Sequence, residues 1–180
     1  INENQLANAE QAIKKAKRKN LEIKKLDQLN KKLFSKANNP GPPQSKLNNI
    51  IQYFQKGEFT LARNLALSII EDFPKHPFAW KALGGILKQT GKLSKALLAC
   101  KEYTKLVPED YEGYNNVGVL LKELGKLKEA EESYKQAINL KSDYTLAHFS
   151  LGDVLKELGK SEEAETSYRK AISLKPDYAE

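Results

Sequence analysis

The sequence contains few of the residues on which metal and redox chemistry usually depend. Its 180 residues include one cysteine, two histidines, one tryptophan and no methionine. The lone Cys100 excludes an internal disulfide. His76 and His148 lie far apart, with no HExxH pattern and no second cysteine, so they do not form a zinc-ligand set. We therefore expect no metal, no cofactor and no catalytic residues, and we predict that the chain is not an enzyme.

Long apolar runs are also missing. No run approaches the roughly 20 residues needed to cross a bilayer, and no signal-peptide pattern opens the chain. Because 29% of the residues are charged, we expect a water-soluble protein. A single cysteine fits a reducing compartment, so we expect a cytoplasmic location. Since the chain lacks methionine even at position 1, we also expect it to be a piece of a longer protein.

Positive charge is concentrated at the N-terminus. Residues 1–39 contain ten Lys/Arg and four Asp/Glu, a balance of +6, whereas residues 40–180 contain twenty and nineteen, a balance of +1. We predict a basic amphipathic helix over residues 1–38 and a Pro/Gly linker over residues 39–45. A solubilising or coiled-coil spacer is one interpretation of this helix, and contact with an anionic membrane surface is another. The basic run consists of Lys14, Lys15, Lys17, Arg18 and Lys19. Nucleic acid is not expected as a partner, because Phe34 is the only ring in the segment.

The rest of the sequence repeats every 34 residues. Glycine recurs at positions 57, 91, 125 and 159, and alanine recurs at positions 62, 96, 130 and 164. A fixed period of this length indicates stacked repeats. We predict four units, each with two helices joined by a turn at the glycine: 43–76, 77–110, 111–144 and 145–178. Residues 179–180 would begin a truncated further repeat. No segment alternates like a strand, so the predicted fold class is an all-α solenoid.

The second unit resembles the tetratricopeptide repeat. The pattern consists of Trp80-x2-Leu83-Gly84-x2-Leu87, then Ala96 and Pro108. The third and fourth units keep the same frame, and the first unit is degenerate. The resemblance covers residues 43–178 and implies a right-handed superhelix. Small residues would let helices approach, glycines would form turns, and aromatics would fill the space between units. The expected structural residues are Trp80, Gly84, Gly91, Ala96, Tyr114, Gly118, Gly125, Ala130, Gly152, Gly159 and Ala164.

The resemblance also implies a binding surface, because in this family the first helices of the repeats line a concave groove. Transferred by register, the groove candidates are Phe54, Phe78, Lys81, Lys88, Asn115, Asn116, Lys122, Phe149, Asp153 and Lys156, together with Leu47 and Ile51. Three of the lysines, at positions 88, 122 and 156, would form a ladder along the groove. Ordinary solvated lysines are the alternative interpretation of that ladder.

We expect a non-enzymatic protein-protein interaction scaffold that binds a peptide or protein segment in this groove. An alternative is the accessory repeat region of a larger enzyme, a transferase or hydroxylase, whose catalytic domain lies outside this chain. The alternative arises because no polar capping helix follows the fourth repeat, which would leave an apolar face open. Self-association through that C-terminal face is a third expectation.

Overall fold

The computed structural model describes residues 41–175, and all of these except Gly41 belong to one compact unit that spans residues 42–180. Within residues 41–175 the chain forms eight helices and no strand. The helices are α2 (Gln44–Gln55), α3 (Phe59–Asp72), α4 (Pro77–Gln89), α5 (Leu93–Leu106), α6 (Tyr111–Glu123), α7 (Leu127–Leu140), α8 (Thr145–Glu157) and α9 (Ser161–Leu174). The expected basic helix at residues 1–38 and the expected further repeat at residues 179–180 lie outside the described residues.

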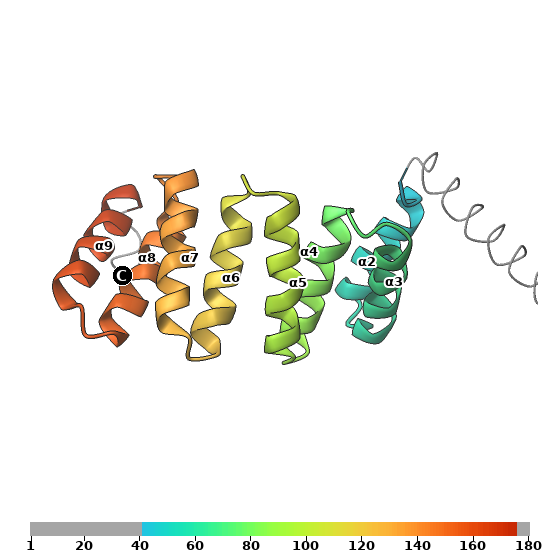
Figure 1. Cartoon of the computed structure of the whole chain (residues 1–180), viewed down its shortest axis with the longest axis horizontal. Coiled ribbons are helices and arrows are strands. Elements are labelled where there is room, and N and C mark those ends of the chain that lie inside the picture. The colour runs from blue at the N-terminus through green and yellow to red at the C-terminus, as the bar shows by residue number, and fades with distance from the viewer. Residues whose placement is uncertain (1–40, 176–180) are drawn as a thin grey trace, which may run out of the picture. The chain divides into compact units, whose positions relative to one another are not determined.

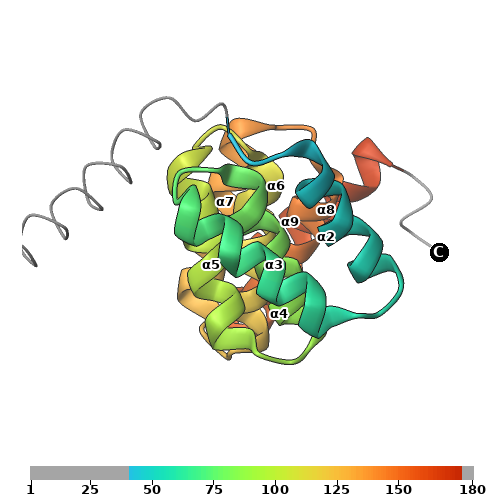
Figure 2. The same cartoon turned by 90° about the vertical axis from the view of Figure 1, so that its right-hand side faces the viewer.

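Each helix packs against the next one along the chain. Figure 1 shows the four helix pairs following one another from α2 and α3 to α8 and α9, and Figure 2 shows the same stack from the end that carries α2 and α3. The all-α solenoid predicted from the 34-residue period is confirmed. We call α2, α4, α6 and α8 the first helices of the repeats, and α3, α5, α7 and α9 the second helices.

A glycine turn joins the two helices of each repeat. Gly91 follows α4 with a φ of 71°, a left-handed conformation that a residue with a Cβ rarely adopts. Its N–H donates to the Lys88 carbonyl at 2.9 Å, and the N–H of Lys92 donates to the Leu87 carbonyl at 2.8 Å. These two bonds satisfy carbonyls at the end of the helix and reverse the chain. The same turn recurs with φ of 75°, 72° and 76° at Gly57, Gly125 and Gly159.

The two helices of a repeat approach closely where a glycine faces a bulky side chain. A Cβ built on Gly118 in α6 would lie 2.6 Å from Cε1 of Tyr134 in α7, and Gly152 in α8 faces Tyr168 in α9 in the same way. Tyr134 is almost completely buried. The rings therefore pack on the glycine of their own repeat, whereas we expected them to fill the space between repeats.

Neighbouring repeats meet at a different small residue, which the sequence analysis did not identify. Gly113 lies in the first turn of α6 and faces α5 of the preceding repeat. A Cβ on Gly113 would lie 3.0 Å from the ring of Tyr103 and 3.1 Å from Thr104. At the same register, Ala79 and Ala147 are fully buried. The signal that could have identified this position was present, since it recurs at 34-residue intervals. A small side chain here allows one repeat to lie on the next.

Polar contacts also join neighbouring repeats. Glu131 of α7 is buried and accepts hydrogen bonds from Lys135 at 2.6 Å and from Lys160, in the following repeat, at 2.9 Å. These two bonds outweigh the effect of burial and lower the pKa of Glu131.

A hydrogen bond also holds the Trp80 ring, near the start of α4, against the chain that precedes this helix. The indole N–H of Trp80 donates to the Pro74 carbonyl at 2.8 Å.

Replacing Gly118 with alanine is expected to lower the free energy of unfolding by about 1–3 kcal/mol, because the new methyl group overlaps the buried Tyr134 ring. Urea denaturation followed by circular dichroism would measure the change. Gly85→Ala is the matched control, since a Cβ at Gly85 meets no atom within 4 Å. That control should raise stability by up to about 1 kcal/mol through helix propensity. A Gly118→Ala midpoint at or above that of the parent chain would contradict the close approach.

Candidate functional site

Most of the predicted groove residues reach the surface on one side of the repeats, the side formed by the first helices. We call this surface the first-helix face. Exposed or partly exposed members are Phe54, Phe78, Lys81, Lys88, Asn116, Lys122, Phe149, Asp153 and Lys156. Ile51, with 43% of its surface exposed, and Phe54, with 40%, are among the large apolar side chains that remain open to solvent. Both belong to α2.

The expectation is wrong for Asn115 and for Leu47, which are both buried. Only 3% of Asn115 is exposed, and its Oδ1 has no hydrogen-bond partner among the described residues. At the same register the longer Lys81 reaches the surface, whereas the shorter Asn115 remains covered by its neighbours. Leu47 is apolar and lies in the core cluster. Register alone therefore predicted the face of the helix but not the reach of each side chain.

The predicted lysine ladder is a series of ion pairs between repeats. Lys88 in α4 lies 3.6 Å from Glu123 in α6, and Lys122 in α6 lies 3.3 Å from Glu157 in α8. Lys122 also approaches Asp153 to 2.9 Å. These two lysines thus each meet an acidic residue of the following repeat. Lys156 has no ion-pair partner among residues 41–175.

Asp110 gathers several contacts just before α6. Its Oδ1 accepts the N–H of Glu112 at 2.9 Å, which caps the helix, and its Oδ2 accepts a hydrogen bond from Lys81 at 3.1 Å. The Tyr103 hydroxyl also donates to this carboxylate. Burial by itself would raise the pKa of Asp110, but the bonds from Tyr103 and Lys81 outweigh it, and the pKa lies below its usual value. The cluster connects α4, α5 and α6 beside the first-helix face.

Two neighbouring pockets open on the first-helix face. The α2–α4 pocket, of about 200 Å³, is lined by apolar side chains from two first helices, including Ile51, Phe54 and Phe78. The α4–α6 pocket, of about 240 Å³, is lined by residues that include Lys81, Lys88 and Cys100. Gly85 lines both pockets. The sequence analysis identified Phe54, Phe78 and the two lysines, but it did not identify Gly85 or Cys100 as part of a binding surface.

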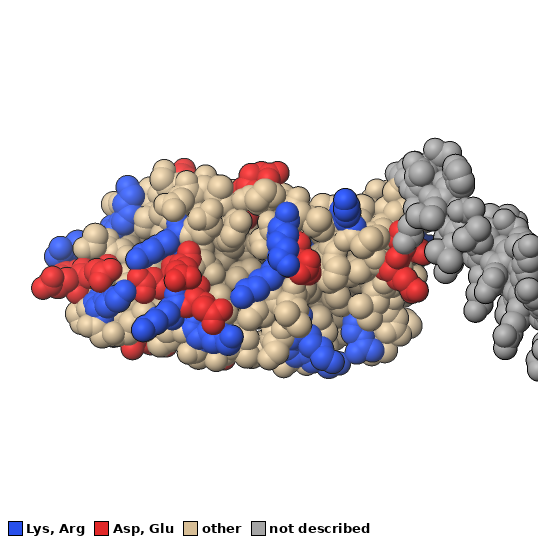
Figure 3. Space-filling view, viewed as in Figure 1, with Lys and Arg blue, Asp and Glu red and all other residues tan. Residues whose placement is uncertain are grey.

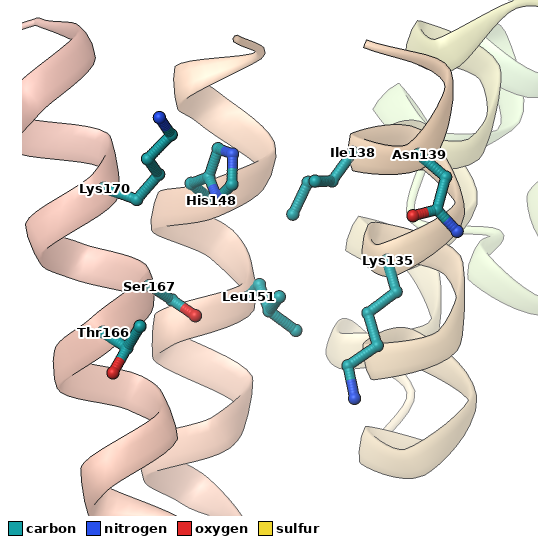
Figure 4. Close-up of a pocket in the computed structure, with 8 residues that line it drawn as sticks. All are labelled: Lys135, Ile138, Asn139, His148, Leu151, Thr166, Ser167 and Lys170. Carbon is teal, nitrogen blue, oxygen red and sulfur yellow. The ribbon is translucent and has the colours of Figure 1, made fainter. Parts of the chain in front are cut away.

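A third pocket, of about 410 Å³, lies between α7, α8 and α9. Figure 4 shows Ile138 from α7 and Leu151 from α8 entering the space between these two helices, with Ser167 and Lys170 coming from α9. His148 stands at the register of Trp80 and contacts the Ser142 carbonyl at 3.0 Å. This third pocket shares no lining residue with either pocket on the first-helix face.

The charged residues do not define a site by themselves. On the face shown in Figure 3, basic and acidic side chains are interspersed, and no large area carries one sign. Among the described residues, no three histidine, cysteine or carboxylate side chains come together in a way that would hold a metal ion. No helix within residues 41–175 combines the length and the apolar character that a membrane span requires.

Models of the tetratricopeptide repeat match residues 48–111 and 146–178, and a TPR repeat model matches residues 118–159. The chain belongs to the tetratricopeptide repeat family. Proteins of this family are typically non-catalytic scaffolds, and this member is accordingly a protein-interaction scaffold. No curated protein sequence matches the chain.

Solved structures of MamA share the fold of this tetratricopeptide repeat protein. One crystal structure of MamA is 21% identical, covers 82% of this chain and 86% of its own, and has a TM-score of 0.72. MamA from Desulfovibrio magneticus RS-1, from residue 41 to its end, is 18% identical, with 76% and 77% coverage and a TM-score of 0.70. MamA MSR-1 is 25% identical, with 74% and 76% coverage and a TM-score of 0.67.

Changing Asp110 to asparagine tests the cluster beside the first-helix face. Asparagine caps a helix about as well as aspartate, so the variant removes charge and keeps the cap. We expect a loss of about 1 kcal/mol in the free energy of unfolding at neutral pH, because the bonds from Lys81 and Tyr103 lose their charged acceptor. Denaturation curves at several pH values would measure it.

The pH dependence has a definite sign. The folded-state pKa of Asp110 is lowered, so its charge stabilises the fold above the unfolded pKa, near 4, and this contribution is lost as the pH falls further. The difference between the parent chain and Asp110→Asn should therefore shrink below about pH 4. The exposed Asp143, changed to asparagine, is the control. A difference that persists unchanged in acid would contradict a charge-dependent role for Asp110.

Proposed function

We propose that the first-helix face binds an extended segment of a partner protein and that the chain performs no chemistry of its own. The observation that carries this proposal is the α2–α4 pocket, where Ile51 and Phe54 remain exposed beside an apolar cavity. Exposed large apolar side chains that gather at a cavity are typical of binding surfaces. Phe78, at the start of α4, forms the opposite wall of this pocket.

The energetics support a binding role for this pocket. Burying one leucine or phenylalanine side chain is worth about 1.5–3 kcal/mol, and a few such anchors usually dominate an interface. The lining residues stand on helices that pack into the core, so they are ordered before a partner arrives. Less conformational entropy is then lost when the partner binds.

The only cysteine does not suggest a nucleophile. Burial raises the pKa of the Cys100 thiol to about 11, and the nearby charge of Lys88 offsets only part of this rise. A thiol with such a pKa is almost entirely protonated at neutral pH, whereas catalytic cysteines depend on the thiolate. This chemistry supports a role for Cys100 in packing rather than in catalysis.

Selection of binding peptides would test the proposal. A phage-displayed library of random peptides is panned against the full chain, and the enriched peptides are synthesised and measured by fluorescence polarisation. Phe54→Ser should weaken their binding by about tenfold or more, because it removes one wall of the apolar pocket. Circular dichroism would show that the variant remains helical.

Leu98→Ser is the matched control. Leu98 lies on the second helix α5 and is 66% exposed, so the change removes a large apolar side chain away from the first-helix face. Its peptide affinities should equal those of the parent chain. Peptides that bind Phe54→Ser as tightly as the parent, or that lose affinity only with Leu98→Ser, would show that the proposed surface is wrong.

A further inference from the structure

In the second repeat, the two residues that face each other across one interior position are both small, whereas each of the other three repeats has a bulky side chain there. Within each repeat, one residue of the first helix faces one residue of the second helix across the interior. In the third and fourth repeats these pairs are Gly118 with Tyr134 and Gly152 with Tyr168, so a ring fills the space. In the first repeat the corresponding pair is a buried isoleucine and a buried alanine, at positions 50 and 66. The second repeat has small residues on both sides.

These two small residues are Gly84 and Cys100, and the α4–α6 pocket lies over them. A Cβ at Gly84 would lie 2.6 Å from the Cys100 Sγ, so the two helices are already in contact. No tyrosine ring stands at this register in the second repeat, and the α4–α6 pocket is lined by both small residues. Tyr103, one turn further along α5, lines this pocket without filling it.

Gly85 has no structural reason to be glycine. It is exposed in the middle of α4, a Cβ added there would meet no atom within 4 Å, and its backbone is not in the left-handed region. A glycine inside a helix lowers stability by about 1 kcal/mol relative to alanine. The other repeats place Ile51, Val119 and Asp153 at this register. Gly85 lines both pockets. Because it has no side chain, α4 presents less of a barrier between the two pockets at this point.

The spacing of the two pockets suggests the shape of the segment that would occupy both. They lie in successive grooves on the two sides of α4. Helix α2 is in direct contact with α4, and helices in contact are about 8–10 Å apart, so the two grooves are separated by roughly this distance. A polyproline II segment rises about 3.1 Å per residue with three residues per turn. Side chains three residues apart in such a segment therefore project from the same side and are about 9 Å apart.

Charge suggests what else the segment carries. Lys81 and Lys88 line the α4–α6 pocket, and no acidic residue lines either pocket. Lys81 is held by Asp110. Lys88 contacts Glu123 only at 3.6 Å, with both side chains exposed, and such surface pairs contribute little. Lys88 is therefore available to a carboxylate of a bound segment.

We propose that the two pockets form one binding site for an extended partner segment with two apolar side chains three residues apart and an acidic residue between them, with Gly85 and Cys100 as the residues that determine this specificity. This inference rests on the proposed function of the first-helix face.

The test compares Gly85→Val with Gly85→Ala. Valine is the residue that the third repeat carries at this register, whereas alanine adds a single methyl group. The random peptide library is panned against the parent chain and both variants. The parent and Gly85→Ala should enrich the pattern of two apolar residues three apart with Asp or Glu between them, and Gly85→Val should bind the selected peptides about tenfold more weakly. Urea midpoints would show that both variants are folded.

Cys100 supplies a second readout that needs no substitution. It is the only cysteine, and its raised pKa makes the reactive thiolate scarce. Its reaction with excess N-ethylmaleimide is therefore followed over hours at mildly alkaline pH, by mass spectrometry of the intact chain. A selected peptide should slow this reaction in the parent chain, because the bound side chain covers the floor of the α4–α6 pocket. Unchanged reactivity at saturating peptide would overturn the inference even if Gly85→Val did not fold.

The outcomes separate this inference from the proposed function. Peptides that require Phe54 but bind Gly85→Val normally and leave Cys100 reactive would overturn the two-pocket site and leave the proposed function standing. Peptides that are indifferent to both Phe54→Ser and Gly85→Val, or a failure to enrich any peptide, would overturn both. If analytical ultracentrifugation instead shows self-association that Gly85→Val abolishes, a second copy occupies the site and the inference is wrong.

Discussion

The repeat structure depends on contacts between bulky side chains and positions that have almost no side chain. The ring of Tyr134 packs so closely on Gly118 that it would overlap a Cβ there, and Tyr103 packs against Gly113 of the next repeat. The first contact joins the helices of one repeat, and the second joins one repeat to the next. Because such interiors are closely packed, even one added methyl group is felt. A chain built from these two contacts extends in one direction and leaves the first-helix face free of this packing.

The second repeat shows how this arrangement produces a specialised surface. A repeat needs its interior filled, but the side chain that fills it can come from either helix, as Ile50 and Tyr134 show. When Gly84 and Cys100 leave the position underfilled, the missing volume becomes a pocket that opens beside Lys88. The apolar α2–α4 pocket, which Phe54 lines, lies next to this pocket, and Gly85 lines both. The proposed binding site thus depends on departures from the repeat pattern, while the residues that agree with the pattern stabilise the fold.

The sequence predicted the fold well because its determinants are periodic. Four glycines at an interval of 34 residues indicate the turns, and the structure has a left-handed residue at each of them. The site was less predictable. Register places Lys81, Asn115 and Phe149 at equivalent positions, but the exposure of each depends on its length and on its neighbours, so Asn115 is buried. Gly85 and Cys100 were not among the predicted site residues, and only the three-dimensional arrangement shows that both line the α4–α6 pocket and that Gly85 also lines the α2–α4 pocket.

The ion pairs along the first-helix face provide order more than stability. Lys122 reaches both Asp153 and Glu157 of the next repeat, yet exposed pairs of this kind are individually worth little. Their effect is to pair Lys122 of the third repeat with two carboxylates of the fourth. Helices α2 and α4 carry lysines but no carboxylate of their own, and the exposed Ile51 and Phe54 of α2 line an apolar pocket together with Phe78 of α4. At the end of the face formed by α2 and α4, an apolar pocket lies next to a pocket lined by the weakly paired Lys88, which is the combination that the proposed apolar segment with one carboxylate requires.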